Sequence, residues 1–315
     1  SLGKVALDLR MVAALRTERA RAGADLVVAH NVEAAWACAA AGVTPFVYFA
    51  HTSMHDELPY YLAPRFHALA SAAGDVLDRG ACARAASVFA LTPVLGARLS
   101  ALHPRVDVVL PPFEPPTLAP PSRRTARARL GLPADAPVAL YAGNLDAYQG
   151  IELLLRALEH APSSWRLLVA TASAPEPLRA LARTHGVHAR VVFAPLSTEH
   201  DRAAAHAAAD VALVPRLASG GLPIKLLEAL ARGVPVVANR RALAGLPIED
   251  AGDILTVVAD DSPRALADGM EQLRARLGGA ECELAGDAAL AAAGVTLQRF
   301  VSTFQRACAR ALTAR

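Results

Sequence analysis

Aromatic residues, cysteines and long apolar runs are all scarce in this sequence, and each shortage excludes a class of protein. Aromatic side chains make up 5% of the 315 residues, so we expect hydrophobic cores built from alanine, leucine and valine. The cysteines, at positions 38, 82, 282 and 308, lie far apart, without the paired spacing of a zinc site or the framework of a secreted domain. No apolar run approaches the roughly 18 residues that cross a bilayer. These absences favour a protein of the reducing cytoplasm that is soluble or lies at most on a membrane surface.

Charge of one sign is scarce as well. The formal net charge is +3, and the arginines are scattered along the chain rather than clustered with aromatic residues, so we expect no nucleic-acid partner. The sequence also lacks an Asp-x-Asp motif and any cluster of ligands with suitable spacing. We therefore expect neither a metal ion nor a cofactor.

Apolar runs and turn-forming residues divide the chain into two unequal halves. The first half predicts a helix at 2–22 and strands at 26–29, 45–50, 87–91 and 106–110, with helices between them. The prolines of 111–124 exclude ladder hydrogen bonds and helix interiors, which indicates a stiff, extended hinge. The second half predicts strands at 138–142, 166–170, 191–194, 211–214, 234–238 and 254–258, nearly all separated by helices.

Regular alternation of strands and helices is typical of a parallel, doubly wound sheet, so the predicted fold class is α/β with two Rossmann-like domains. We expect the first domain at 1–110, the hinge at 111–124, the second domain at 125–295, and a C-terminal helix at 296–315 that returns to the first domain. The first half offers fewer strands than the second and begins within a helix. We interpret the first domain as incomplete at its start; a naturally smaller domain is the alternative.

The stretch ALVPRLASGGLPIKLLEALARGVPVVAN, residues 212–239, predicts strand, glycine-rich loop, helix and strand. Pro223 suits the first position of the helix, and Gly233 suits its end. Gly220 and Gly221 would leave backbone N–H groups and a helix N-terminus at the carboxyl edge of the sheet. Such an edge is suited to an anion such as a diphosphate.

The helix in this stretch carries two charged residues. Glu228 could accept hydrogen bonds from the vicinal hydroxyls of a ribose, and Lys225, one turn nearer the loop, could supply a positive charge for phosphate. The alternative is that both are solvated residues of an amphipathic helix whose buried face is formed by Ile224, Leu227 and Leu230.

A second glycine follows the strand at 138–142. Gly143 would let the backbone approach a ligand, and the spacing of Asp146 and Gln149 predicts a capping box for a helix that starts near Tyr148. A tight turn with a good cap is the purely structural alternative. Because two glycine-bearing strand ends belong to one sheet, we favour a nucleotide diphosphate as the ligand.

In the first half, polar residues follow two predicted strands. His51 stands at a strand end, with His55 in the loop beyond it, and an imidazole there could contact a sugar, a phosphate or a reacting hydroxyl. His30, Asn31 and Glu33 follow the preceding strand. A lone histidine is more often structural, so both interpretations stay open at these positions.

The next stretch of the first half is apolar and aromatic. Tyr60, Tyr61, Arg65 and Phe66 could line a groove for an acceptor. They could equally be an apolar anchor for the helix that follows.

Three stretches and the hinge resemble the glycosyltransferases of family 4. The stretches are YAGNLDAYQG, SGGLPIKLLEALARGVPVVAN and DLVVAHNVEAAWACAAAGVTPFVYFAHTSMHDELPYYL. The resemblance extends over nearly the whole chain from about position 25. It implies the GT-B fold, in which two Rossmann-like domains face each other across a cleft. It also implies a nucleotide-sugar donor bound mainly to the second domain and an acceptor bound mainly to the first.

Several residues match the family pattern. Glu228 matches the second glutamate of the E-x7-E motif, expected at the ribose, and Gly143 matches the first glycine of the phosphate loop. His51 matches the histidine expected near the donor sugar and is the predicted catalytic residue. The remaining donor-side candidates are Asn144, Gly220, Gly221, Leu222, Pro223, Lys225 and Leu226, and the acceptor-side candidates are Asn31, Glu33 and His55.

The sequence also departs from the family pattern. The first glutamate of the E-x7-E motif would fall at Gly220, and Asn144 and Gln149 stand where many members carry an arginine and a lysine that neutralise the diphosphate. Lys225 could supply part of that charge, with helix N-termini supplying more. The family's N-terminal glycine loop has no counterpart in this sequence.

The resemblance implies a retaining, hexosyltransferase-type glycosyltransferase that needs no metal. Its donor would be a nucleotide diphosphate sugar and its acceptor a hydroxyl of a glycan or of a lipid-linked molecule, in glycan or cell-envelope polysaccharide synthesis. The expected location is cytoplasmic, with a peripheral position at the inner face of the membrane as the alternative. Two alternatives remain: a non-catalytic GT-B protein that binds a nucleotide sugar or glycan, and a GT-B nucleotide-sugar epimerase.

Overall fold

The computed structural model describes residues 2–114, 116–146, 149–217, 221–246, 248, 254–277, 290 and 294–313, without the side chains of 2–6, 8 and 20. The chain divides into two compact units. The first consists mainly of Ser1–Pro112 and Val295–Arg315, and the second of Phe113–Ser219 and Pro223–Gly294. Within the described residues, no helix combines the length and apolar character needed to cross a bilayer.

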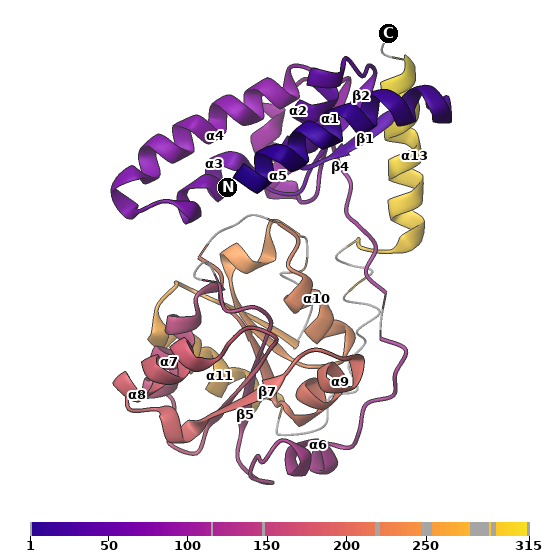
Figure 1. The fold of residues 1–315 in the computed structure, drawn as a ribbon. Helices are drawn as coiled ribbons and strands as arrows, with labels where there is room; N and C mark the ends of the chain where they lie inside the picture. Colours follow the sequence, from indigo (N-terminus) through magenta and orange to yellow (C-terminus); the bar gives the residue numbers. More distant parts are fainter. Residues whose placement is uncertain are drawn as a thin grey trace. The chain divides into compact units, whose positions relative to one another are not determined.

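The first unit contains a four-stranded parallel sheet in the order β1-β2-β3-β4 (Figure 1). Its elements are α1 (Leu2–Ala22), β1 (Val27–His30), α2 (Asn31–Ala41), β2 (Phe46–Ala50), α3 (Met54–Glu57), the 3-10 turns η1 (Leu58–Tyr61) and η2 (Pro64–Phe66), α4 (His67–Cys82), β3 (Ser87–Ala90), α5 (Pro93–Ser100), β4 (Val106–Val108) and α13 (Leu297–Thr313).

Strand β2 is buried on both of its faces because successive side chains point to opposite sides of the sheet. Phe46 and Tyr48 belong to a core with α2, α4 and α5. Val47 and Phe49 belong to a second core, to which the C-terminal helix contributes. The continuous apolar run of this strand therefore follows from its position between two layers of helix.

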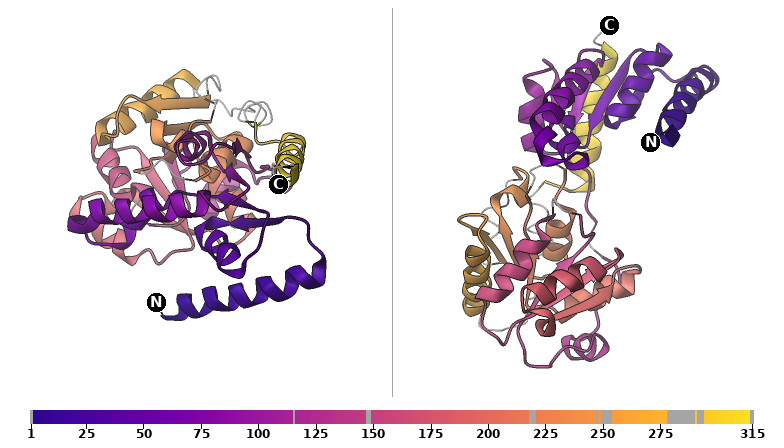
Figure 2. Two further views of the ribbon diagram at one scale, coloured as in Figure 1. Left: turned by 90° about the horizontal axis from the view of Figure 1, so that it is seen from above. Right: turned by 60° about the vertical axis from the view of Figure 1, so that its left-hand side comes forward.

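Helix α13 joins the first unit although it lies nearly 200 residues beyond β4 in the sequence. Ala307 and Ala311 are buried against the sheet, and the ring of Phe304 meets that of Phe89 edge-on at 5.6 Å between centroids. Figure 1 and Figure 2 show this helix in yellow, running beside the sheet of the first unit. Arg310 adds an ion pair with Asp107 of β4. The helix covers the face that α2, α4 and α5 leave open.

The second unit contains a six-stranded parallel sheet in the order β10-β9-β8-β5-β6-β7. Its elements are α6 (Arg123–Arg129), β5 (Val138–Ala142), α7 (Ile151–His160), β6 (Arg166–Thr171), α8 (Glu176–Thr184), η4 (His188–Arg190), β7 (Val191–Pro195), α9 (Glu199–Ala208), β8 (Val211–Val214), α10 (Ile224–Ala231), β9 (Val236–Asn239), η5 (Arg240–Leu243), β10 (Leu255–Val258) and α11 (Pro263–Leu277).

The chain order of this sheet reverses between β5 and β8. From β5 the chain moves outward through β6 and β7, then crosses back to β8 and moves outward in the other direction through β9 and β10. Helices α7, α8 and α11 share one core with the sheet, whereas α9 contacts β5 and α10 contacts β8 and β9. Ligands of open α/β sheets bind beyond the carboxyl ends of the strands at such a reversal.

Helix α6 is attached to the second unit by a buried arginine. The Arg127 side chain, 5% exposed, is paired with Asp210 at 2.7 Å. It also donates to the carbonyl oxygens of Ala208, at 3.0 Å, and Ala134, at 2.5 Å. Asp210 is further held by Arg123 and by the backbone N–H of Val138.

Replacing Arg127 by methionine should lower the free energy of unfolding of the second unit by about 2 kcal/mol, because it leaves two carbonyl groups and part of a carboxylate without partners. Arg129→Met on the same helix is the matched control, since that side chain is 58% exposed and its carboxylate partner lies at 3.5 Å. Urea unfolding of both variants measures the difference. Equal effects would contradict the assignment.

The predicted elements are found, with small shifts at their ends. Strand β1 lies one residue later than expected, and β9 begins at Val236 rather than Val234. Pro223 is the N-cap of α10 rather than its first residue. The predicted capping box at Asp146 is wrong: α7 begins at Ile151 and its N-cap is Gly150, whose φ of 70° is a left-handed conformation suited to glycine.

Candidate functional site

Gly143 and Lys225 meet at the reversal point of the second sheet. Gly143 follows the last residue of β5, and its N–H donates to Ala170 at the end of β6. Its φ is 150°, and a Cβ atom there would lie 1.9 Å from Cε of Lys225. Glycine suits this position because other residues rarely adopt such a φ, and an added Cβ would displace the flexible end of the Lys225 side chain that lies over the backbone.

The environment of Lys225 favours its neutral form. Burial and, to a lesser degree, the nearby charge of Arg216 lower the pKa of this lysine to about 8, while Asp146 acts in the opposite direction. The ammonium nitrogen lies over the Tyr141 ring, 5.5 Å from its centroid. A cation with so little water around it interacts strongly with an anion that reaches it.

The loop after Gly143 is ordered by its own polar groups. The hydroxyl of Tyr141 donates to the carbonyl oxygen of Asn144, and the Asn144 amide donates to the carboxylate of Asp146, both at 2.5 Å. Asn144 stands where the resemblance predicts a cation, and here it orients a carboxylate instead. Gln149, the other such position, is buried.

The glycine-rich loop before α10 is described only in part. Gly220 lies outside the described residues, and Gly221 has a left-handed φ of 73°. Leu222 is partly exposed, whereas Pro223 is buried. The side chain of Leu226 is fully buried in the core, and its N–H is bonded within the first turn of α10 to the carbonyl of Pro223.

Glu228 is neither solvated nor free. Its side chain is 12% exposed and lies between Arg202 of α9 and Arg232, the C-cap residue of α10. The distances are 3.3 Å from Arg202 and 3.1 Å from Arg232, which also pairs with Glu199 at 2.7 Å. The alternative of an amphipathic helix placed Ile224 on the buried face, and this is wrong because Ile224 is 57% exposed.

Arg216 is a site residue that sequence analysis missed. It is the second residue after β8, and its backbone N–H and carbonyl are hydrogen-bonded to the side-chain amide of Asn239. Its positive charge contributes to the lowered pKa of Lys225. The sequence V-P-R places this arginine directly after a predicted strand of the second sheet, and that position could have indicated a site residue. Arg216 and Lys225 together provide two positive charges where Asn144 and Gln149 provide none.

In the first unit, His51 is bonded to another histidine. Nε2 of His51 lies 2.9 Å from Nδ1 of His30, with the rings edge to face, and both rings contact Phe49. Burial and the proximity of His30 lower the pKa of His51. Asn31 follows with a left-handed φ of 68°, which turns the chain from β1 into α2. Glu33 lies in the first turn of α2.

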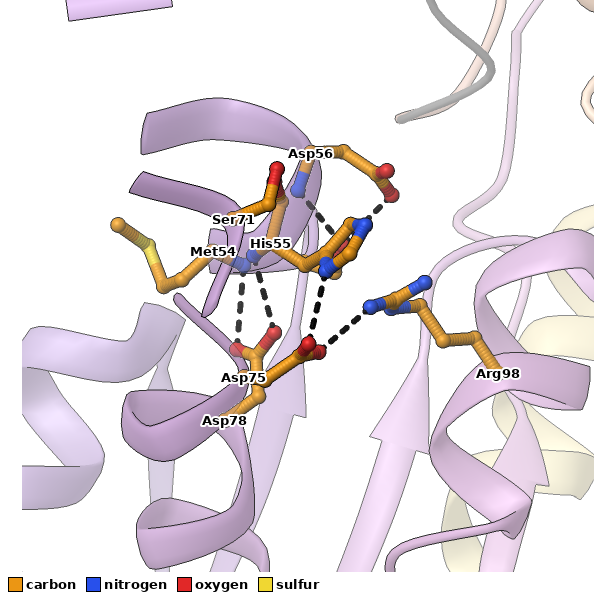
Figure 3. A network of polar contacts seen from close by, with 8 residues as sticks. Met54, His55, Asp56, Ser71, Asp75, Asp78 and Arg98 are labelled. Carbon is orange, nitrogen blue, oxygen red and sulfur yellow. Dashed lines mark hydrogen bonds and ion pairs between the residues drawn. The ribbon is translucent and has the colours of Figure 1, made fainter. Parts of the chain in front are cut away.

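His55 lies in a polar network that joins α3, α4 and α5 (Figure 3). Its Nδ1 is 3.0 Å from Asp75, which also pairs with Arg98 at 2.7 Å. The fully buried Asp78 accepts hydrogen bonds from the backbone N–H groups of Met54 and His55. Burial raises the pKa of Asp78 despite these bonds. The network fixes the loop that follows His51.

The segment beyond α3 exposes large apolar side chains rather than anchoring them. Tyr61 and Leu69 are both 71% exposed. Tyr60, Leu62 and Phe66 are also exposed, and the Arg65 guanidinium stacks on the Phe66 ring at 4.8 Å. The apolar-anchor alternative is therefore wrong for this segment.

Among the residues that the structure describes, no three His, Cys, Asp or Glu side chains are grouped to hold a metal ion. Cys38, Cys82 and Cys308 are free thiols, and Cys282 lies outside the described residues.

Comparison with known proteins places this architecture in a class. The family model of glycosyl transferases group 1 matches residues 136–276. A sucrose-phosphate synthase from Thermosynechococcus elongatus superimposes with a TM-score of 0.79 at 20% identity, covering 96% of this chain and 78% of that one. The structure of Anabaena HepE with UDP and glucose superimposes with a TM-score of 0.74 at 21% identity, covering 100% of this chain and 83% of that one. The fold is GT-B.

Almost all the residues that match this family model lie in the second unit. A D-inositol 3-phosphate glycosyltransferase from Xylanimonas cellulosilytica is 37% identical over 192 residues, 58% of this chain and 43% of that protein. Another, from Mycobacterium tuberculosis, is 37% identical over 150 residues, 46% of this chain and 30% of that protein. The chain thus spans less than half the length of these relatives.

Proposed function

We propose that this chain is a family 4, hexosyltransferase-type glycosyltransferase, which moves a sugar from a nucleotide diphosphate sugar to a hydroxyl acceptor with retention of configuration. The observation that carries the proposal is the meeting of Lys225 with Gly143 at the reversal point of a group 1 domain. A desolvated cation beside a helix N-terminus suits a diphosphate at this edge.

The donor diphosphate would be neutralised without a metal. Lys225 and Arg216 supply the positive charges, and the N-terminus of α10 supplies N–H donors. Glu228 would hold the ribose hydroxyls through the lone pairs that its arginine partners leave. Leu222 and Pro223 would contribute through the backbone of the loop.

The reaction would be a same-face displacement. The bond between the anomeric carbon and the donor phosphate oxygen breaks, a bond from that carbon to the acceptor oxygen forms on the same face, and the acceptor proton passes to the departing phosphate. His51 would orient the sugar, and Asn31, Glu33 and His55 of the first unit would contact the acceptor. The proposed role of His51 is to bind the sugar, and burial with the proximity of His30 lowers its pKa, which favours the uncharged imidazole.

The acceptor is proposed to be a hydroxyl of a glycan or of a lipid-linked molecule, or of a polyol such as the one named for the relatives. The exposed apolar segment around Tyr61 and Leu69 supports a peripheral contact with the inner face of the membrane, because aromatic and aliphatic side chains of this kind suit the interface.

A thermal-shift panel of UDP-, GDP- and ADP-sugars tests the donor proposal. A ligand that binds only the native state stabilises it by mass action and so raises Tm. At a ligand concentration of 100 times the dissociation constant, the free energy of unfolding increases by about 2.7 kcal/mol. Transfer or hydrolysis of the labelled donor by the same chain then separates an enzyme from a binding protein. No Tm shift with any of these sugars would contradict the proposal, and a shift without turnover would favour the non-catalytic alternative.

A further inference from the structure

One face of α4 holds the backbone of His55. The α3 backbone lies against Gly74, where a Cβ atom would be 2.3 Å from the carbonyl carbon of Met54 and 2.4 Å from the nitrogen of His55. One turn later Asp78 accepts from the N–H of His55 at 3.3 Å, and one turn earlier Ser71 donates to its carbonyl oxygen at 3.1 Å. Because these positions share one helix face, α4 fixes both the N–H and the carbonyl of His55.

The same face of α4 also fixes the ring of His55. Its Nδ1 lies 3.0 Å from one carboxylate oxygen of Asp75, and the other oxygen pairs with Arg98 of α5 at 2.7 Å (Figure 3). Desolvation raises the pKa of Asp75, but the hydrogen bonds and charges of His55 and Arg98 outweigh it and lower that pKa, which favours the carboxylate ion. A carboxylate ion only accepts hydrogen bonds, so Nδ1 of His55 must be the donor.

Nε2 of His55 therefore carries the lone pair when the ring is neutral. The side chain is 33% exposed, and within the described part of the chain no group is hydrogen-bonded to Nε2. A lone pair on an imidazole nitrogen accepts a hydrogen bond from a hydroxyl group, and it has no proton to donate to a phosphate oxygen.

The charges around His55 disfavour an anion as well. The network of Figure 3 contains three carboxyl groups and one guanidinium group: Asp56 of α3, Asp75 and Asp78 of α4, and Arg98 of α5. Arg98 is already paired with Asp75. The excess of carboxyl groups repels a phosphate group that approaches the ring, whereas a neutral hydroxyl is not repelled.

We propose that His55 binds a neutral hydroxyl of the acceptor through Nε2, that Asp75 is the positioning residue that fixes this tautomer, and that the site selects against an acceptor with a phosphate group at the same position. The contacts of α4 with the His55 backbone hold the ring in one place, so the lone pair keeps one direction. This inference rests on the proposed function, because the acceptor is a substrate of that reaction, and it adds which chemical group the acceptor presents.

Ring 15N spectra of the whole chain, labelled with 15N-histidine and recorded at pH 8, test the tautomer. Asp75→Leu removes the acceptor of the Nδ1 proton, whereas Asp75→Asn keeps an acceptor oxygen. We expect the Nδ1–H tautomer of His55 to dominate in the wild type and in Asp75→Asn, and mixed tautomers in Asp75→Leu. Glu159→Leu is the matched control, because Glu159 lies 2.7 Å from Nδ1 of His185 in the second unit. It should change the signals of His185 and leave those of His55 unchanged.

Titration with myo-inositol and with myo-inositol 3-phosphate, which differ by one phosphate group, tests what the ring binds. In the wild type, myo-inositol should shift the Nε2 resonance of His55, and the phosphate should shift it less at the same concentration. Asp75→Leu should bind myo-inositol about fivefold more weakly, because the hydrogen bond from the ligand is no longer directed. Asp75→Asn should keep the affinity for myo-inositol and gain affinity for the phosphate, because it removes a negative charge and keeps the oxygen.

Three results would each overturn the proposal: stronger binding of the phosphate than of myo-inositol by the wild type, no response of His55 to myo-inositol, or unchanged His55 spectra in Asp75→Leu. If His55 responds as expected but the chain transfers no sugar from any donor of the thermal-shift panel, the proposed function fails while the binding of a hydroxyl by His55 stands.

Discussion

Replacing Lys225 by methionine should weaken binding of the nucleotide diphosphate donor about 100-fold and at the same time stabilise the free protein. The loss of affinity follows from removing a desolvated cation from a hydrogen-bonded charge pair, which costs about 2–5 kcal/mol. The gain in stability follows from the depressed pKa, about 8 in place of 10.5. Such a shift corresponds to up to about 3 kcal/mol near neutral pH.

The sign of the pH dependence follows from proton binding. Between pH 8 and 10.5 the unfolded chain keeps the Lys225 proton while the folded chain releases it, so the free energy of unfolding of the wild type should rise with pH across this window. Donor affinity should fall over the same window because the ammonium is lost. The methionine variant should show neither trend.

The pKa itself can be measured directly, because Lys4 is the other lysine of the sequence. Reductive methylation with 13C-formaldehyde gives NMR signals from these two side chains and the N-terminus, and Lys4 serves as an internal reference. Gly143→Ala is a second variant, since it displaces the lysine without removing its charge. Wild-type donor affinity in both variants would show that Lys225 does not contact the donor.

Replacing Glu228 by glutamine should lower the free energy of unfolding by about 2 kcal/mol, because it removes the charge from one of the two carboxylates that pair with the buried Arg232, which keeps only Glu199. Asp268→Asn is the matched control. It breaks another i,i+4 pair, with Arg264, whose side chains are 81% and 60% exposed, and an exposed pair contributes at most about 0.5 kcal/mol. Urea unfolding at pH 7 measures both variants.

The same Glu228→Gln variant should raise the donor KM about tenfold with little change in kcat, because a lost charge-assisted hydrogen bond weakens ground state and transition state together. Comparing a nucleoside diphosphate with its 2′,3′-dideoxy analogue isolates the ribose contribution. The wild type should prefer the ribose form, and the variant should lose that preference. A large fall in kcat with an unchanged ribose preference would assign Glu228 a different role.

The fold class and most strands could be predicted because local patterns specify them. The apolar runs at 138–142 and 211–214 became β5 and β8 with the predicted bounds, and α1 spans the predicted 2–22. Strand ends shifted where ladder pairing with a neighbour decides the boundary, as at Val236, which pairs with both β8 and β10. The capping box failed because Gly150, in a left-handed conformation, starts α7 instead.

The candidate site was predictable in residue type but not in its partners. Gly143 and Lys225 were assigned to one edge of one sheet, and they meet there. The arginine clamp on Glu228 could not be predicted, because Arg202 lies on α9, 26 residues earlier in the chain. The pairing of His51 with His30, and the position of Arg216 beside Lys225, likewise depend on which strands become neighbours.

Local sequence patterns were enough to predict two α/β halves, each built on a parallel sheet, because apolar periodicity, glycine and proline act over a few residues. Tertiary structure alone decided the protonation and charge of the site. Lys225 has a pKa of about 8, the pKa of His51 is lowered, and Glu228 is fixed between two arginines. The physical reason is that desolvation and electrostatic interactions depend on distances in space, which residues far apart in the chain acquire only when the sheets form.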